Sequence, residues 1–162
     1  MSPDTRVPND PMRRIRRFLA LPNDEIWAFF EAALLLSVAK FAVAILPFRW
    51  IARHLGPFGR PGPYEGDPGD QNLRPRVMRS LGRAARHLPW KTTCLARAIA
   101  GYCMLSRRGV RSTLYLGVAK ESGSGELSAH AWLRSGDLVL TGGNEDLRRY
   151  TIVGSFTSGE LP

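Results

Sequence analysis

Two side chains in this 162-residue sequence have the types and the order of a cysteine–histidine catalytic pair, Cys94 and His130. Cys94 follows Thr92 and Thr93, either of which can cap a helix, and few helix breakers come between it and Gly109. A thiol in the first turn of a helix lies among unpaired backbone N–H groups at the positive end of the helix dipole. Because that setting favours the thiolate, which is the nucleophile, we expect any covalent chemistry to begin at Cys94.

His130 lies at the centre of a predicted strand, 127–134, between two alanines that leave room for a substrate. An imidazole can hold the proton of the thiol and later deliver it to a leaving amine, and a third group fixes its tautomer. Two competing residues are less suitable. Cys103 projects away from Cys94 on the same helix and is expected to pack, and His87 is interpreted as a structural or surface residue.

The third catalytic residue is left open by the sequence. If the chain turns directly after the histidine strand, antiparallel register places His130 opposite residues 141–143, which include no carboxylate. Asn144 and Asp146 follow and can fold back, whereas Asp137 in the turn lies about 15 Å along the strand. We therefore predict Asn144, with Asp146 and then Asp137 as alternatives.

The elements that position these residues predict an α+β fold. Apolar residues recur at helical spacing from 73 to 88, a second helix carries Cys94, and after Gly109 the period becomes two. Strands are predicted at 112–119, 127–134 and 138–141, with a last strand or edge segment in the tail after residue 144. The Cys94 helix should therefore pack on an antiparallel sheet. The solvent side of the helix that begins at residue 73 should carry its arginines: Arg74, Arg76, Arg79, Arg83 and Arg86.

Composition divides the chain into four parts. Residues 1–12 are polar with several prolines and are predicted to be disordered, and 13–55 form an N-terminal helical region. The segment 56–72 carries five glycines and four prolines without periodicity and is predicted to be a linker. Residues 73–162 then form the domain that holds the candidate catalytic pair.

The segment 26–46 is the most apolar part of the chain, and a helix start precedes it with Asn23 or Asp24 as the predicted cap. Its length is close to a membrane span, but Glu31 and Lys40 interrupt it. We expect a buried or partner-packed helix rather than a membrane helix, with peripheral contact at a membrane surface as the intermediate possibility.

The net charge of +9 allows nucleic acid, anionic lipid or an acidic peptide as partner. The arginines come in scattered pairs without an RNA-binding motif or zinc-finger spacing, so nucleic acid is disfavoured. No phosphate-binding glycine motif is present, and no metal or other cofactor is expected. Two unpaired cysteines and the lack of a secretory signal favour the cytoplasm.

Several segments resemble a known family, the transglutaminase-like leader peptidase of lasso-peptide biosynthesis (the B-type maturation protein). These are Cys94 to Ala98, Arg-Arg-Gly-Val at 107–110, Gly-Val at 117–118, His130-Ala131-Trp132, Val-Leu-Thr-Gly-Gly at 139–143 with Tyr150 and Phe156 downstream, and Arg-Arg-Phe-Leu-Ala-Leu-Pro at 16–22. The resemblance implies a papain-like or transglutaminase-like core with a Cys-His-Asp triad. This chain departs from that pattern because no aspartate stands at the expected place.

The resemblance also implies a function: a cysteine protease that removes the leader from a ribosomally made precursor through a Cys94 thioester. A cyclase resembling asparagine synthetase would then close the macrolactam. No β-rich recognition module precedes residue 73, so a separate leader-recognition protein is expected. The oxyanion hole would use the Cys94 N–H and a second donor, for which Lys91 and Trp90 are nearby candidates. The alternatives are a non-catalytic transglutaminase-like peptide-binding or scaffold protein and a membrane-associated adaptor built on residues 26–46.

Overall fold

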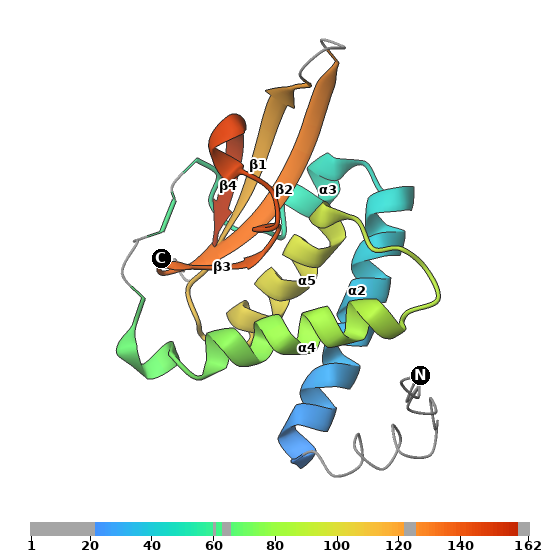
Figure 1. Cartoon of the computed structure of the whole chain (residues 1–162), viewed down its shortest axis with the longest axis vertical. Helices are drawn as coiled ribbons and strands as arrows, with labels where there is room; N and C mark the ends of the chain where they lie inside the picture. Colours follow the sequence, from blue (N-terminus) through green and yellow to red (C-terminus); the bar gives the residue numbers. More distant parts are fainter. Residues whose placement is uncertain (1–21, 60, 63–65, 122–125, 159–162) are drawn as a thin grey trace, which may run out of the picture.

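The computed structural model describes residues 22–59, 61–62, 66–121 and 126–158 (Figure 1). The segment 1–12, predicted to be disordered, lies outside the described residues. Within the described residues four α-helices precede four strands, and the predicted α+β class is confirmed. The helices are α2 (Asn23–Ile45), α3 (Phe48–Ala52), α4 (Leu73–His87) and α5 (Cys94–Ser106). The strands are β1 (Thr113–Lys120), β2 (Leu127–Ser135), β3 (Leu138–Thr141) and β4 (Thr151–Thr157), and 3-10 turns occur at Pro68–Asp70 and Leu147–Arg149.

The four strands form one antiparallel sheet in the order β3-β2-β1-β4. The β2 residue His130 pairs with Gly117 of β1, and Leu133 pairs with Thr141 of β3. The register expected from the sequence is therefore close to the observed one. Pairing between β2 and β3 begins only at Leu133, so the first half of β2 is held by β1 alone.

The sheet separates two clusters of side chains, because successive residues of a strand point to opposite faces. We call the face covered by the helices the helix-side face. It carries apolar residues of all four strands, namely Leu114, Ala131, Leu133, Leu140 and Phe156. The other face, called the outer face, carries an aromatic cluster of Tyr115, Trp132 and Tyr150 with Ala119.

Helix α5 packs directly on the helix-side face (Figure 1). Gly101 makes this close approach possible, because a Cβ there would lie 2.7 Å from Cδ2 of Leu133 and 3.0 Å from Cδ1 of Leu81. The helix ends where the sequence predicts. Gly109 has a φ of 69°, which favours glycine, and the following Val110 N–H donates to the Leu105 carbonyl at 3.0 Å.

Helix α2 packs on α4 and α5 through small residues, with Ala28, Ala32, Leu36 and Ala39 buried. Three of these belong to the same cluster as the helix-side face of the sheet, so the N-terminal helical region shares its core with the segment after residue 73. The predicted cap of α2 is wrong. The helix begins at Asn23 after Pro22, which provides no side-chain cap, and Asp24 Oδ1 accepts from the neighbouring Glu25 N–H instead.

The predicted solvent-facing row of arginines on α4 is wrong at its first member. Arg74 is 6% exposed, and its guanidinium donates to the Ser135 carbonyl and to Asp137 Oδ1, both at 3.2 Å. It also donates to the Asp67 carbonyl at 3.4 Å. Arg74 thereby fixes the segment before α4 to the turn between β2 and β3, where buried carbonyl groups need donors. Arg79 and Arg86 are exposed as predicted.

Candidate active site

Cys94 is the first residue of α5, and the predicted cap is confirmed as Thr93. The Thr93 hydroxyl accepts a hydrogen bond from the Ala96 N–H at 3.2 Å, which satisfies one of the unpaired donors of the first turn. Thr92 is fixed as well, since its hydroxyl accepts from Arg97 Nε at 2.7 Å. Cys94 is partly exposed and packs against the helix-side cluster.

The thiol lies on the sheet-facing side of α5. Cys94 and Gly101 are seven residues apart, about two helical turns, so they share one stripe, and Gly101 abuts Leu133 of β2. Helix α5 and strand β2 run in the same general direction (Figure 1). Cys94 lies about 10 Å before Gly101 along α5, and this distance corresponds to roughly three residues of β2. Counting back from Leu133, Cys94 is therefore level with residues 129–131.

His130 belongs to the outer face. Its ring stacks on Trp132, with centroids 6.2 Å apart, and lies 5.2 Å from the ring of Tyr150. The Nε2 atom donates to the Gly142 carbonyl at 2.9 Å, and Nδ1 lies 3.6 Å from Oε1 of Glu145. When the ring carries both protons, each faces an acceptor oxygen. The imidazole is 8% exposed and is thus held on all sides.

Cys94 and His130 are brought to the same level of β2 but on opposite faces of the sheet. Ala131, the neighbour of His130, points into the helix-side cluster to which Cys94 also belongs. Among the hydrogen bonds of the described residues, none joins the thiol to the imidazole. The structure therefore does not pair the two predicted catalytic side chains directly.

The acid beside His130 is Glu145, which the sequence analysis missed although it lies between two candidates. The other oxygen of its carboxylate accepts a hydrogen bond from the Tyr150 hydroxyl. This bond is the largest cause that raises the pKa of Tyr150 above its ordinary value, because the phenolate would face a negative charge. His130, Glu145 and Tyr150 therefore form a linked polar group within the aromatic cluster.

The three predicted candidates for the third residue are engaged elsewhere or are exposed. Asn144 is exposed, and its side chain makes no hydrogen bond within the described residues. Asp146 caps the 3-10 turn that follows it, accepting from the Arg148 N–H at 3.1 Å. Asp137, 88% exposed, pairs with Arg74.

Two glycines make room for the ring stack. At Gly142, which has a φ of 79°, a Cβ would lie 2.6 Å from the Ala131 carbonyl and 3.0 Å from His130 Nε2. At Gly117 it would lie 2.8 Å from Trp132. Gly142 is where the chain leaves β3 and crosses the outer face, which brings Glu145 to the imidazole. A glycine pair after a short strand is the only sequence signal for this crossing.

Trp90 and Lys91, the two residues considered as oxyanion donors, lie just before the cysteine helix. The Trp90 indole N–H is buried and makes no hydrogen bond within the described residues. The Lys91 carbonyl accepts from Lys40 Nζ at 3.0 Å. This contact uses an acceptor of Lys91 and none of its donors, whereas the unpartnered donor of Trp90 is buried.

The competing residues have separate environments. Burial raises the pKa of the Cys103 thiol, which disfavours its thiolate, and nearby Arg107 opposes this in part. His87 is exposed, with Nδ1 2.8 Å from the Arg83 carbonyl, in agreement with the structural or surface role predicted for it. Among the described residues there is no group of three or more His, Cys, Asp or Glu side chains that could hold a metal ion.

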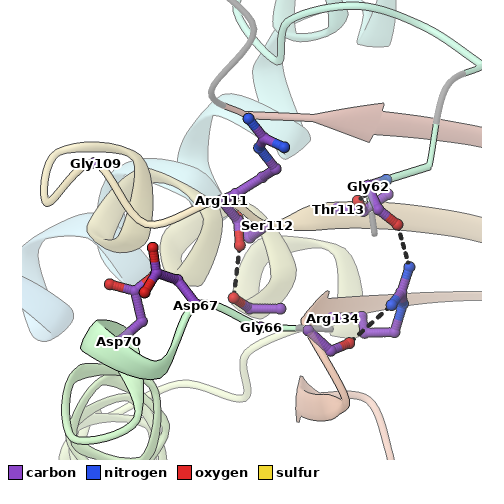
Figure 2. A pocket seen from close by; sticks show the side chains of 11 residues that line it. Gly62, Gly66, Asp67, Asp70, Gly109, Arg111, Ser112, Thr113 and Arg134 are labelled. Atoms are coloured by element: carbon purple, nitrogen blue, oxygen red, sulfur yellow. Dashed lines mark hydrogen bonds between the residues drawn. The ribbon is translucent and has the colours of Figure 1, made fainter. Parts of the chain in front are cut away.

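A cavity of about 330 Å³ lies at the far end of β2 and does not include Cys94 or His130 (Figure 2). Arg134 lines it, but the guanidinium is occupied: it donates to the carbonyls of Gly62 and Gly136 and to the Tyr115 hydroxyl. These bonds fix the segment before α4 to the sheet. We therefore assign Arg134 a structural role.

The fold and the cysteine helix define a class of protein. The family model of the transglutaminase-like superfamily matches residues 42–155, from the last turn of α2 into β4, and the chain belongs to this superfamily. The matched range includes Cys94 and His130. The chain matches no curated protein and no solved structure.

Proposed function

We propose that this protein is a cysteine peptidase that removes the leader from a lasso-peptide precursor, with Cys94 as nucleophile. Membership of the transglutaminase-like superfamily is consistent with cysteine-protease-like activity. The observation that carries the proposal is the position of Cys94 as the first residue of a capped helix, packed against the sheet that holds His130. The resemblance of its sequence motifs to the lasso-peptide leader peptidases supplies the substrate class.

The reaction proceeds in two steps in this proposal. The Cys94 thiolate attacks the carbonyl carbon at the end of the leader, and the C–N bond breaks as the leaving amine takes a proton. Water then attacks the thioester, which releases the leader as a carboxylic acid and restores the thiol. The Cys94 N–H and the free Trp90 indole N–H are the donors proposed for the oxyanion.

General base and acid catalysis is assigned to His130, and Glu145, in place of the predicted Asn144, holds the imidazole on the outer face before it reaches Cys94. Reaching Cys94 requires the imidazole to come to the helix-side face. In a β-strand this corresponds to a one-residue shift of register, which turns every affected side chain to the other face. The first half of β2 can shift at lower cost than the second, because only β1 pairs with it.

The partners proposed for this activity are those of the leader peptidases that the chain resembles. A separate protein would recognise the leader, and a cyclase resembling asparagine synthetase would use the released core peptide. The reaction would take place in the cytoplasm, where the precursor is made.

The test is to incubate purified protein with a candidate precursor and its recognition protein and to measure product masses over time. We expect leader removal by the native chain and by Cys103→Ala, and a loss of at least about a thousandfold in Cys94→Ala. Circular dichroism of each variant checks that the fold is retained. Equal rates in Cys94→Ala and the native chain would disprove the peptidase proposal.

A second candidate is a non-catalytic module that binds the precursor or organises the maturation complex. The separation of Cys94 and His130 by the sheet favours it, since a scaffold has no need for their contact. In this case the leader peptide binds with the same affinity to the native chain and to Cys94→Ala, and processing in the reconstituted system does not depend on Cys94.

A further inference from the structure

One face of α2 exposes a continuous row of large apolar side chains. Its members follow each other at intervals of three or four residues, so they lie on one stripe of the helix. We call this stripe the α2 apolar face: Trp27, Phe30, Leu34, Val38, Phe41 and Ile45, each at least 53% exposed. It is about 27 Å long. Isolated exposed apolar residues are ordinary, but a contiguous row of this length marks a surface that binds something.

The opposite face of α2 determines how the helix can meet a bilayer. Of the described helices, α2 alone is long and apolar enough to cross a membrane by length and composition. Its other face, however, is part of the protein core. Its charged residues are bound to the same body: Glu25 pairs with Arg83 at 3.3 Å and Glu31 with Arg108 at 2.5 Å. Spanning would break these contacts, whereas lying flat on a surface keeps them and covers only the apolar face.

Positive charge surrounds the α2 apolar face. Arg76, Arg107 and Arg108 line a groove with its N-terminal half. Beyond its C-terminal end, Arg49 and Arg53 are exposed and form no ion pair within the described residues. Arg76 pairs with Asp24, and Arg107 and Arg108 share Glu31, so these five arginines still outnumber the three acids of α2, Asp24, Glu25 and Glu31. The whole chain carries +9. Such a border complements a surface of anionic lipid headgroups.

The aromatic residues fit the same occupant. Trp27 is 75% exposed near one end of the helix, and Trp50 of α3 is 53% exposed just beyond the other end. Tryptophan favours the level of the headgroups, where its ring is buried and its N–H stays hydrated. We propose that the α2 apolar face binds the surface of an anionic bilayer, with α2 parallel to the membrane plane. This proposal does not depend on the peptidase activity.

The test is cosedimentation of the full chain with vesicles of phosphatidylcholine alone and with about one quarter phosphatidylglycerol. We expect at least about tenfold tighter binding to the anionic vesicles, weakened by added salt. Leu34→Ser/Phe41→Ser should reduce binding to both vesicles at least about tenfold, because two apolar side chains no longer insert. Arg49→Glu/Arg53→Glu should reduce binding to the anionic vesicles alone.

The matched control is Leu127→Ser/Ile152→Ser, which removes two apolar residues that are 72% and 54% exposed on the sheet. It should bind vesicles like the native chain, and thermal unfolding should show that every variant is folded. Equal binding to both vesicles, or an equal loss in the control, would overturn the proposal. The proposal would also be overturned if the native chain bound no vesicles but formed a dimer, and if Leu34→Ser/Phe41→Ser abolished that dimer. The α2 apolar face would then bind a second copy of the chain.

Discussion

The two faces of the sheet hold the two halves of the candidate chemistry by different physical means. The helix-side face is mainly aliphatic and closely packed, and Cys94 packs against it from the capped end of a helix. The outer face is aromatic and polar, and it holds His130 by ring stacking and by Glu145. One strand, β2, contributes to both. A single step of its side-chain alternation therefore separates the face of His130 from the face against which Cys94 packs.

The largest effect is expected from removing packing on the helix-side face. Leu133 is fully buried between β2 and α5, and Leu133→Ala leaves a cavity there. The free energy of unfolding should fall by roughly 2–5 kcal/mol, as measured by urea denaturation. Leu127→Ala, on the same strand but 72% exposed, is the control and should change it by less than about 0.5 kcal/mol. Similar losses in both variants would contradict the packing described for α5.

His130→Ala tests whether His130 and Cys94 interact in the free protein or only during the proposed reaction. Leader removal should fall about a hundredfold or more, because the proposed base is lost. The rate at which iodoacetamide alkylates Cys94 in the absence of substrate should stay within about twofold, because the sheet separates thiol and imidazole at rest. A large drop in the alkylation rate would show that the two side chains already meet in the free protein.

The two cysteines should differ in reactivity about tenfold at neutral pH, with Cys94 alkylated first. Burial raises the pKa of Cys103, so its thiolate fraction is small at neutral pH and its labelling should increase as the pH is raised towards that higher pKa. Peptide mass spectrometry after short exposure to iodoacetamide at several pH values measures both rates. Equal or reversed labelling would count against an activated thiolate at Cys94.

The smallest effect concerns the carboxylate of the outer face. Glu145→Gln removes the negative charge that accepts the Tyr150 hydroxyl, so the pKa of Tyr150 should fall towards its ordinary value. Titration of tyrosinate absorbance in Tyr150→Phe and Glu145→Gln, compared with the native chain, isolates the change. An unchanged titration in Glu145→Gln would mean that the hydrogen bond does not persist in solution.

Much of the fold follows from local patterns. Period-two alternation predicts the bounds of β1 and β2 to within one residue and those of β3 without error. Thr93, which caps α5, is one of the two caps expected for that helix. The face of His130 is harder to predict, because alternation shows which residues share a face but not which face the helices cover. The position of Glu145 beside His130 could not be predicted, because it depends on how the chain crosses the outer face after Gly142. The burial of Arg74 could not be predicted either, because the carbonyl groups to which it donates come together only in the folded sheet.

The shared core gives α2 a consequence during protein synthesis. The helix is made before α4 and α5, which bury its alanine face, so this face is not fully covered until residue 106 has left the ribosome. Until then the nascent chain exposes a 23-residue apolar helix with no partner of its own. Exposed apolar surface of this size favours capture by chaperones or aggregation. The yield of folded protein should therefore depend on how quickly α4 and α5 follow α2 out of the ribosome.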